Sequence, residues 1–184
     1  MKHISCQVEG IILKRRNYLE TDRIITVFTR QKGKITVIAK GVRKLHSRRS
    51  PSLELFNNIN LFLIASHNWD IVTETQILNN FTGWKENLVR VGVAYYFCEL
   101  VDRLTAEEQA NIEVYHLLQD SLSRLTNDNL KLLIRYFEET ILQQLGYGIP
   151  KELALCEGSL VRFIETITER KINSPEIIKS FSVC

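Results

Sequence analysis

The sequence lacks the patterns that mark zinc sites, redox motifs and membrane spans. Its four cysteines, Cys6, Cys98, Cys156 and Cys184, include no CxxC pair, so their spacing predicts neither a zinc ribbon nor a thioredoxin-like redox motif. No run of 18 apolar residues occurs, and the first residues lack the apolar core of a signal peptide. We therefore expect a soluble protein of the reducing cytoplasm, without a membrane span.

Catalytic signatures are also missing. The four histidines, His3, His46, His67 and His116, show no spacing typical of metal ligands, and there is no glycine-rich phosphate-binding loop. Paired carboxylates occur at residues 107–108 and 138–139, but neighbours on a helix point about 100° apart, so we expect both pairs on solvated helix faces. The sequence predicts a protein that is not an enzyme and holds no metal or cofactor.

Charge is sorted along the chain. Residues 1–80 carry 13 lysines and arginines against six acidic residues, a net +7, whereas residues 81–184 carry 11 against 15, a net −4. Between Arg30 and Arg49 there are eight basic residues and no acidic one. Solubility alone does not require such a segment, so we interpret it as a surface for a polyanion; a solvated basic loop without a partner is the alternative.

The first 80 residues predict strands. Runs rich in β-branched and apolar residues lie at 7–16, 23–29, 35–39, 55–65 and 71–78. Gly33 suits a tight hairpin between the second and third strands, and the basic residues 40–53 form a long loop before the fourth. Five short strands with this long connection are typical of a small Greek-key barrel, the OB-fold (oligonucleotide/oligosaccharide-binding fold), with an SH3-like barrel as the alternative.

From residue 81 the apolar period becomes helical. It predicts helices over 84–104 and 108–125, and a third helix that Asn127 or Asp128 caps and that ends near Gly146. Weaker helical patterns follow at 160–169 and 175–181. The predicted fold class is α+β with two domains, an OB-fold barrel over residues 1–80 and an all-helical domain over residues 81–184.

A basic barrel of this kind suggests a way to bind nucleic acid. OB-folds bind single strands with cations that follow the phosphates and aromatic rings that stack on bases. Phe28 and Phe62 lie inside apolar runs and are expected in the core, which leaves Tyr18 and Trp69 as stacking candidates. Because aromatic residues are few, we expect binding to depend on phosphates, to be insensitive to base sequence and to weaken steeply with salt.

Several segments resemble the bacterial RecO family of recombination mediators and DNA repair proteins. In the first half they are residues 9–18 (EGIILKRRNY), 20–30 (ETDRIITVFTR), 39–43 (AKGVR) and 52–56 (SLELF). In the second half they are residues 94–96 (AYY), 99–104 (ELVDRL) and 145–147 (LGY). The likeness therefore runs in order through most of the chain, which is more specific than any single motif.

The resemblance implies an N-terminal OB-fold barrel, a helical domain and no catalytic turnover. Members of this family bind single- and double-stranded DNA and anneal complementary strands. With the partner RecR they help to load the recombinase RecA onto DNA coated by single-stranded-DNA-binding protein, and they contact the acidic C-terminal tail of that coating protein. The implied partners are therefore DNA, RecR and this tail, and the implied location is the nucleoid.

The sequence departs from the family toward its C-terminal end. Many members carry a four-cysteine zinc module after the segment that matches residues 145–147, whereas only Cys156 lies in the corresponding stretch here and Cys184 is the last residue. One thiolate cannot build a tetrahedral site that needs four ligands. We expect a helical domain without an intact zinc module.

The expected DNA-binding residues come from two sources. The resemblance implies DNA contacts for the basic residues of the matching motifs, which are Arg15, Arg16, Arg23, Lys40 and Arg43. The charge pattern adds Lys34, Lys44, Arg48 and Arg49. We expect annealing by charge neutralisation, in which the basic surface screens the repulsion between two strands. Two alternatives stay open: an adaptor barrel that docks an acidic protein, with incidental DNA binding, and a nuclease, which the missing metal-ligand pattern disfavours.

Overall fold

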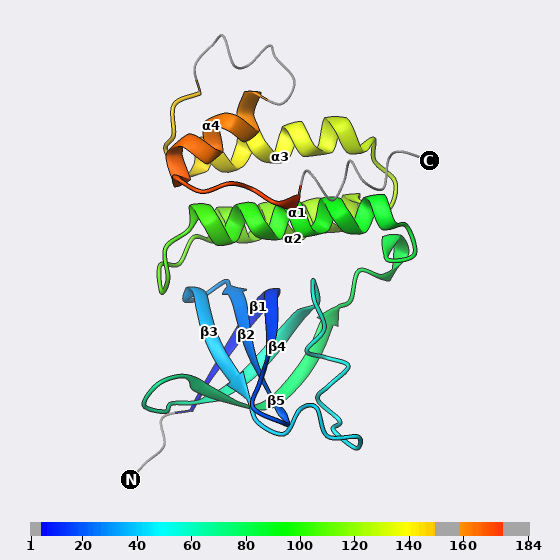
Figure 1. Ribbon diagram of the computed structural model, residues 1–184, viewed down its shortest axis with the longest axis vertical. Helices are drawn as coiled ribbons and strands as arrows, with labels where there is room; N and C mark the ends of the chain where they lie inside the picture. The colour runs from blue at the N-terminus through cyan, green and yellow to red at the C-terminus, as the bar shows by residue number, and fades with distance from the viewer. Residues whose placement is uncertain (1–4, 150–158, 175–184) are drawn as a thin grey trace. The chain divides into compact units, whose positions relative to one another are not determined.

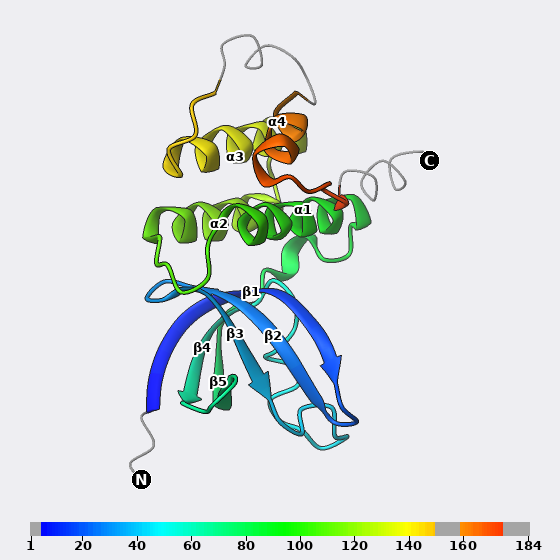
Figure 2. The same ribbon diagram turned by 60° about the vertical axis from the view of Figure 1, so that its left-hand side comes forward.

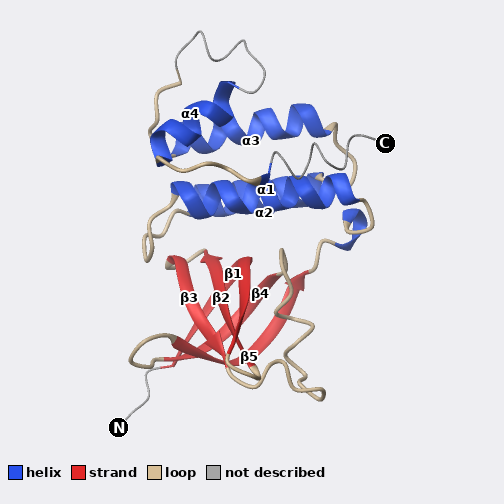
Figure 3. Ribbon diagram, in the orientation of Figure 1, coloured by secondary structure: helices blue, strands red, loops and turns tan. Residues whose placement is uncertain are grey.

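The structure is a computed structural model that describes residues 5–149 and 159–174 of the 184-residue chain. Its contacts divide the chain into two compact units. We call residues 1–81 with 105–115 the barrel unit, and residues 82–104 with those from His116 onward the helical unit. Figure 3 colours the strands red and the helices blue.

The barrel unit is built from five strands in the described part of the chain. These are β1 (Ser5–Tyr18), β2 (Asp22–Thr29), β3 (Gly33–Ala39), β4 (Asn58–Ile64) and β5 (Asp70–Asn79). They close in the order β1–β2–β3–β5–β4 (Figure 1). All pairs are antiparallel except β3 with β5, which run parallel at Val37–Asp70 and Ile38–Ile71. This order confirms the predicted OB-fold barrel over the SH3-like alternative.

Strand β1 closes the barrel because it pairs along both of its edges. Its first half pairs with β4 and its second half with β2, with an irregularity in register between Ile12 and Lys14. Figure 2 shows the resulting curvature of the strand. Gly10 lies in both pairings, and a Cβ there would come within 2.5 Å of Val27 Cγ1. Glycine is therefore required where the bent strand approaches its neighbour.

The barrel core follows the two-residue period of its strands. On β4, Ile59, Leu61 and Leu63 are fully buried inside, while Phe62 points to the other face and is only half-buried. Phe28 is fully buried on β2. The expectation of a core position is confirmed for Phe28 and wrong for Phe62, because successive side chains of a strand face opposite sides.

The loop before β4 is longer than expected. Strand β4 begins at Asn58 rather than at residue 55, because Phe56 takes a left-handed backbone conformation with φ of 70° that ends any extended strand. The backbone N–H of Phe56 donates to Ile12 O at 3.0 Å. The basic loop, which we define as residues 40–57, is thereby fastened to β1 at its far end.

Within the described residues the chain forms four α-helices and a short 3₁₀ turn. They are η1 (Thr82–Trp84), α1 (Leu88–Leu104), α2 (Ile112–Arg124), α3 (Leu130–Gln144) and α4 (Ser159–Thr168). Helices α1 and α3 pack through stacked Phe97 and Phe137 rings, with centroids 4.2 Å apart. None of these helices is long and apolar enough to cross a membrane. The helix predicted at 160–169 corresponds to α4, and the one at 175–181 lies outside the described residues.

Three helix starts differ from the predictions for one reason. An asparagine side chain caps each N-terminus by accepting backbone N–H groups: Asn87 for α1, Asn111 for α2 and Asn129 for α3. Helix α1 therefore begins at Leu88 instead of 84, and α2 at Ile112 instead of 108. The predicted caps Asn127 and Asp128 are wrong, since the next asparagine along the chain takes that role.

The connection between α1 and α2 belongs to the barrel unit. Lys34 and Glu107 form a parallel bridge, and the Glu108 N–H donates to Lys34 O at 2.8 Å. A Cβ on Gly33, whose φ is 70°, would lie 1.9 Å from Gln109 O. This close fit places Glu107 and Glu108 beside β3. The expectation that they occupy a helix face is therefore wrong.

The other predicted carboxylate pair divides between surface and core. Glu139 lies at the surface in an ion pair with Arg135, at 2.7 Å. Glu138 is buried and accepts a hydrogen bond from the Tyr96 hydroxyl at 2.5 Å. Burial raises the pKa of Glu138 to about 7, although the bond from Tyr96 acts in the opposite direction. A solvated position for Glu138 was therefore wrong.

Candidate nucleic-acid interface

Three connections of the barrel lie together. The Arg43 N–H of the basic loop donates to Thr21 O in the β1–β2 turn at 2.9 Å, and the Gly41 N–H donates to Asp22 Oδ1 at 2.7 Å. Tyr18, at the end of β1, contacts Trp69 in the β4–β5 loop. OB-folds bind oligonucleotides and oligosaccharides on the face of β2 and β3 and on two loops, the β1–β2 turn and the β4–β5 loop. The basic loop thus lies beside the surface that this fold uses for binding.

Backbone hydrogen bonds form within the basic loop. Successive turns bring the Lys44 N–H to Gly41 O at 3.3 Å and the Ser47 N–H to Lys44 O at 2.9 Å. Val42 and Leu53 are fully buried in the barrel core and anchor both ends. Backbone hydrogen bonds and buried side chains therefore tie the loop to itself and to the barrel.

Four of the nine predicted DNA-binding residues are held by other parts of the barrel unit. Arg15 and Arg23 both pair with Glu54, the latter at 3.5 Å. The other two are Lys34 and Arg49. The Lys34 ammonium donates to Thr105 O at 2.8 Å, and its side chain is buried. The Arg49 guanidinium donates to Lys40 O at 2.7 Å and to Val72 O.

The other five predicted residues are exposed. We call Arg16, Lys40, Arg43, Lys44 and Arg48 the rim cations. In the part of the chain that the structure describes, none of the side chains of Arg16, Lys40, Lys44 and Arg48 forms a hydrogen bond or ion pair. The Arg43 guanidinium donates to Glu20 O at 3.0 Å while it remains exposed. The rim cations therefore give the barrel a positive surface that phosphates can reach.

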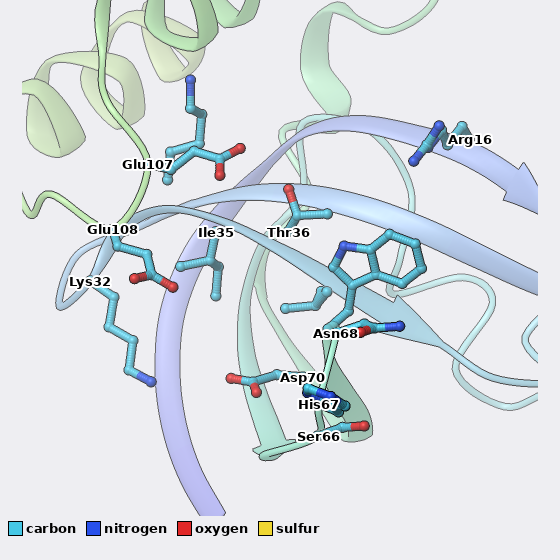
Figure 4. A pocket seen from close by; sticks show the side chains of 13 residues that line it. Arg16, Lys32, Ile35, Thr36, Ser66, His67, Asn68, Asp70, Glu107 and Glu108 are labelled. Atoms are coloured by element: carbon cyan, nitrogen blue, oxygen red, sulfur yellow. The ribbon is translucent and has the colours of Figure 1, made fainter.

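An open cleft of about 510 Å³ adjoins this surface. Its lining comes from Arg16 on β1, residues 32 and 34–37 at β3, residues 66–70 around the β4–β5 loop, and Glu107 and Glu108. Figure 4 shows Arg16 on one side of the cleft, and Lys32, Glu107 and Glu108 on the other. Cations and carboxylates both line it, so the cleft is polar without being uniformly positive.

The two predicted stacking residues are brought together at the cleft. Tyr18 and Trp69 lie edge to face, with ring centroids 5.5 Å apart and planes at 82°. Trp69 lines the cleft, and both side chains are half-buried. One ring therefore supports the other beside an open space.

Sequence reasoning did not select several residues that line the cleft. Ser66, His67, Asn68 and Asp70 lie between the predicted strands 55–65 and 71–78, and the loop between the fourth and fifth strands of an OB-fold is a usual binding element that could have marked them. Glu108 carries no local signal, because its neighbour in space, Lys34, is remote in the sequence.

No metal centre is found among the described residues. In residues 5–149 and 159–174, no three histidine, cysteine, aspartate or glutamate side chains are grouped as ion ligands would be. Cys156 and Cys184 lie outside these ranges.

The fold defines the class of protein, one with an OB-fold barrel and a helical unit. In this chain the barrel carries the basic loop. The family described as "Recombination protein O N terminal" matches residues 1–81, and "Recombination protein O C terminal" matches residues 85–152.

Curated relatives agree with these matches. A DNA repair protein RecO from Roseiflexus sp. (strain RS-1) is 39% identical over 157 residues, which is 84% of this chain and 55% of the relative. The protein of the same name from Moorella thermoacetica is 37% identical over 156 residues, 84% and 58% of the two chains, and that from Symbiobacterium thermophilum 33% over 153 residues, 82% and 60%. The chain thus spans somewhat more than half the length of these relatives. It belongs to the recombination protein O family.

Proposed function

We propose that this protein acts in DNA repair and homologous recombination by binding DNA and annealing complementary strands, without a catalytic step. Family membership supports this role, because the curated relatives are named DNA repair proteins. The single observation that carries the binding proposal is the set of exposed rim cations, four on the basic loop and Arg16 on β1, beside the binding surface of an OB-fold.

Annealing follows from charge neutralisation. Two complementary strands repel each other through their phosphates, and cations on a common surface reduce that repulsion. The rim cations supply this surface, and a backbone hydrogen bond joins the loop that carries Lys40, Arg43, Lys44 and Arg48 to the β1–β2 turn. Because contacts to phosphates carry no base information, any pair of complementary strands is a substrate.

The proposed partners are those that the family resemblance implies. They are single- and double-stranded DNA, RecR, and the acidic C-terminal tail of single-stranded-DNA-binding protein, and the proposed site of action is the nucleoid. With RecR the protein would assist loading of the recombinase onto coated single strands.

An annealing assay tests this function directly. Two complementary oligonucleotides are coated separately with single-stranded-DNA-binding protein and mixed with or without this protein. We expect the protein to accelerate duplex formation and the acceleration to fall as salt is raised. Equal rates with and without the protein would reject the annealing role. Cleavage of either strand in magnesium would reject a function without catalysis.

An adaptor role is the second candidate. The same rim cations fit an acidic protein segment, in which case DNA binding is incidental. Separate titrations with an oligonucleotide and with an acidic peptide distinguish the two functions. The annealing role requires the oligonucleotide to bind at physiological salt, whereas the adaptor role requires only the peptide to do so.

A further inference from the structure

We propose that the cleft beside Trp69 receives an unpaired base of a DNA strand whose phosphates lie on the rim cations. This inference rests on the proposed DNA binding and adds a second contact to it, a contact to the base. A contact to the base distinguishes single strands from duplexes, which the charge of the loop alone does not do.

The aromatic pair supplies the stacking surface. Trp69 borders the open volume of the cleft, and the edge-to-face contact with Tyr18 restricts how its indole can turn. An indole held in one orientation loses little side-chain entropy when a base stacks on it. Tyr18 is therefore a positioning residue for Trp69.

The charges of the cleft favour a base over a phosphate. Three carboxylates, those of Asp70, Glu107 and Glu108, line it. The buried Lys34 ammonium is already bonded to Thr105 O. A phosphate inside would meet these carboxylates, whereas the amino groups of cytosine, adenine or guanine can donate hydrogen bonds to them. The exposed side chains of Arg16 and Lys32 lie on opposite sides of the cleft, where they can hold the phosphates that flank the base.

A paired base cannot take this position. In a duplex each base is stacked and hydrogen-bonded, and extrusion costs free energy that a single strand does not spend. The cleft therefore adds affinity for unpaired nucleotides only. A protein that anneals strands would release this contact as each base finds its complement.

The test compares three DNA ligands on the same protein. Fluorescence anisotropy gives the affinities of wild type and Trp69→Ala for a single strand, an abasic strand of equal length and a blunt duplex. We expect Trp69→Ala to weaken binding of the single strand about fivefold to 150-fold, the range for loss of one stacked base. Its affinities for the abasic strand and the duplex should equal those of wild type.

Two controls accompany the test. Phe62→Ala removes another half-buried aromatic ring of the barrel that does not line the cleft, and should leave all three affinities unchanged. The chain has two tryptophans, and Trp84 is buried in the helical unit. Quenching of tryptophan emission by the single strand should therefore disappear in Trp69→Phe.

The outcomes separate this inference from the proposed function. Equal binding of the single strand by wild type and Trp69→Ala, or an equal loss for the abasic strand, overturns the base contact alone. If wild type binds none of the three ligands, the proposed function fails and the base contact fails with it.

Discussion

In the barrel unit most ionised side chains lie on loops and strand ends, whereas in the helical unit a carboxyl side chain, that of Glu138, lies in the core. The barrel's apolar core cluster holds no ionisable residue other than a half-buried cysteine at its edge, among the residues that the structure describes. The buried cation Lys34 donates to a backbone carbonyl. The helical unit buries Glu138 against the neutral Tyr96 hydroxyl. The two units should therefore respond to different variables, the barrel to salt through its ligands and the helical unit to pH through its stability.

The largest effect is expected where the barrel depends on backbone fit rather than on charge. Gly33→Ala adds a Cβ 1.9 Å from Gln109 O at a φ of 70°, so residues 105–109 must move away from β3. We expect a loss of about 3 kcal/mol or more in the free energy of unfolding, measured by urea titration. Gly148→Ala is the control, because a Cβ there meets nothing within 4 Å. A similar loss in both variants would contradict the fit described at Gly33.

The second effect concerns pH and the helical unit. Protonated Glu138 is favoured in the folded state, because its pKa rises from 4.5 to about 7. Its contribution is fully present below pH 4.5 and is lost as pH rises through 7, by an amount on the order of 3 kcal/mol. Glu138→Gln, which cannot ionise, should remove this dependence and make the helical unit more stable than wild type at pH 8.

Urea titrations between pH 4.5 and 8 measure this effect. Trp84, whose indole donates to Leu122 O at 2.7 Å, reports on the helical unit in a Trp69→Phe background. Glu139→Gln is the matched control, since Glu139 is only partly buried and is paired with Arg135. The comparison between the units breaks down if wild type and Glu138→Gln show the same slope of stability with pH.

The smallest effect on stability is expected for the rim cations. Replacing Lys40, Lys44 and Arg48 together by alanine removes exposed side chains, and each change should alter the free energy of unfolding by less than about 0.5 kcal/mol. Affinity for a single strand should fall, and the log-log salt slope should become less negative by up to about 2, at about 0.7 per phosphate. Arg49 is left in place because it bonds two backbone carbonyls of the barrel.

A variant that removes the same charge elsewhere tests whether the change in salt slope belongs to the basic loop. Lys131, Arg162 and Arg170 are exposed in the helical unit, and their joint replacement by alanine removes the same charge. We expect this variant to keep the wild-type salt slope. A change equal to that of the rim variant would mean that net charge, rather than the basic loop, determines binding.

The elements of the fold were predictable because their signals are local. Strand and helix periods are set by residues a few positions apart, and the order of five strands with one long connection indicated the barrel. Element starts were less predictable, since Asn127, Asp128 and Asn129 are all suitable caps and only the structure shows that Asn129 is used. The family resemblance was equally readable from ordered motifs.

The candidate site was only partly predictable because partners distant in sequence decide which charges are exposed. The Lys34 ammonium is bonded to a carbonyl 71 residues away, and Glu138 to a hydroxyl 42 residues away. Neither hydrogen bond can be predicted from the residues next to Lys34 or Glu138 in the sequence. Charge counting therefore found the basic surface and overestimated how many of its cations are exposed, while the cleft emerged only when β3, the β4–β5 loop and Glu108 came together.

The barrel unit is discontinuous in the chain, since residues 105–115 complete it after α1 has intervened. During synthesis the five strands leave the ribosome first, and for a time β3 lacks the backbone partner that Glu108 later provides. Tyr115 joins this segment to β1 and β4, because its hydroxyl forms hydrogen bonds with Glu9 at 2.8 Å and with Asn58 at 3.1 Å. Completion of the barrel must therefore wait until the residues of α1 have been made. A nascent chain stopped at residue 81 would hold all five strands and still lack one wall of the cleft.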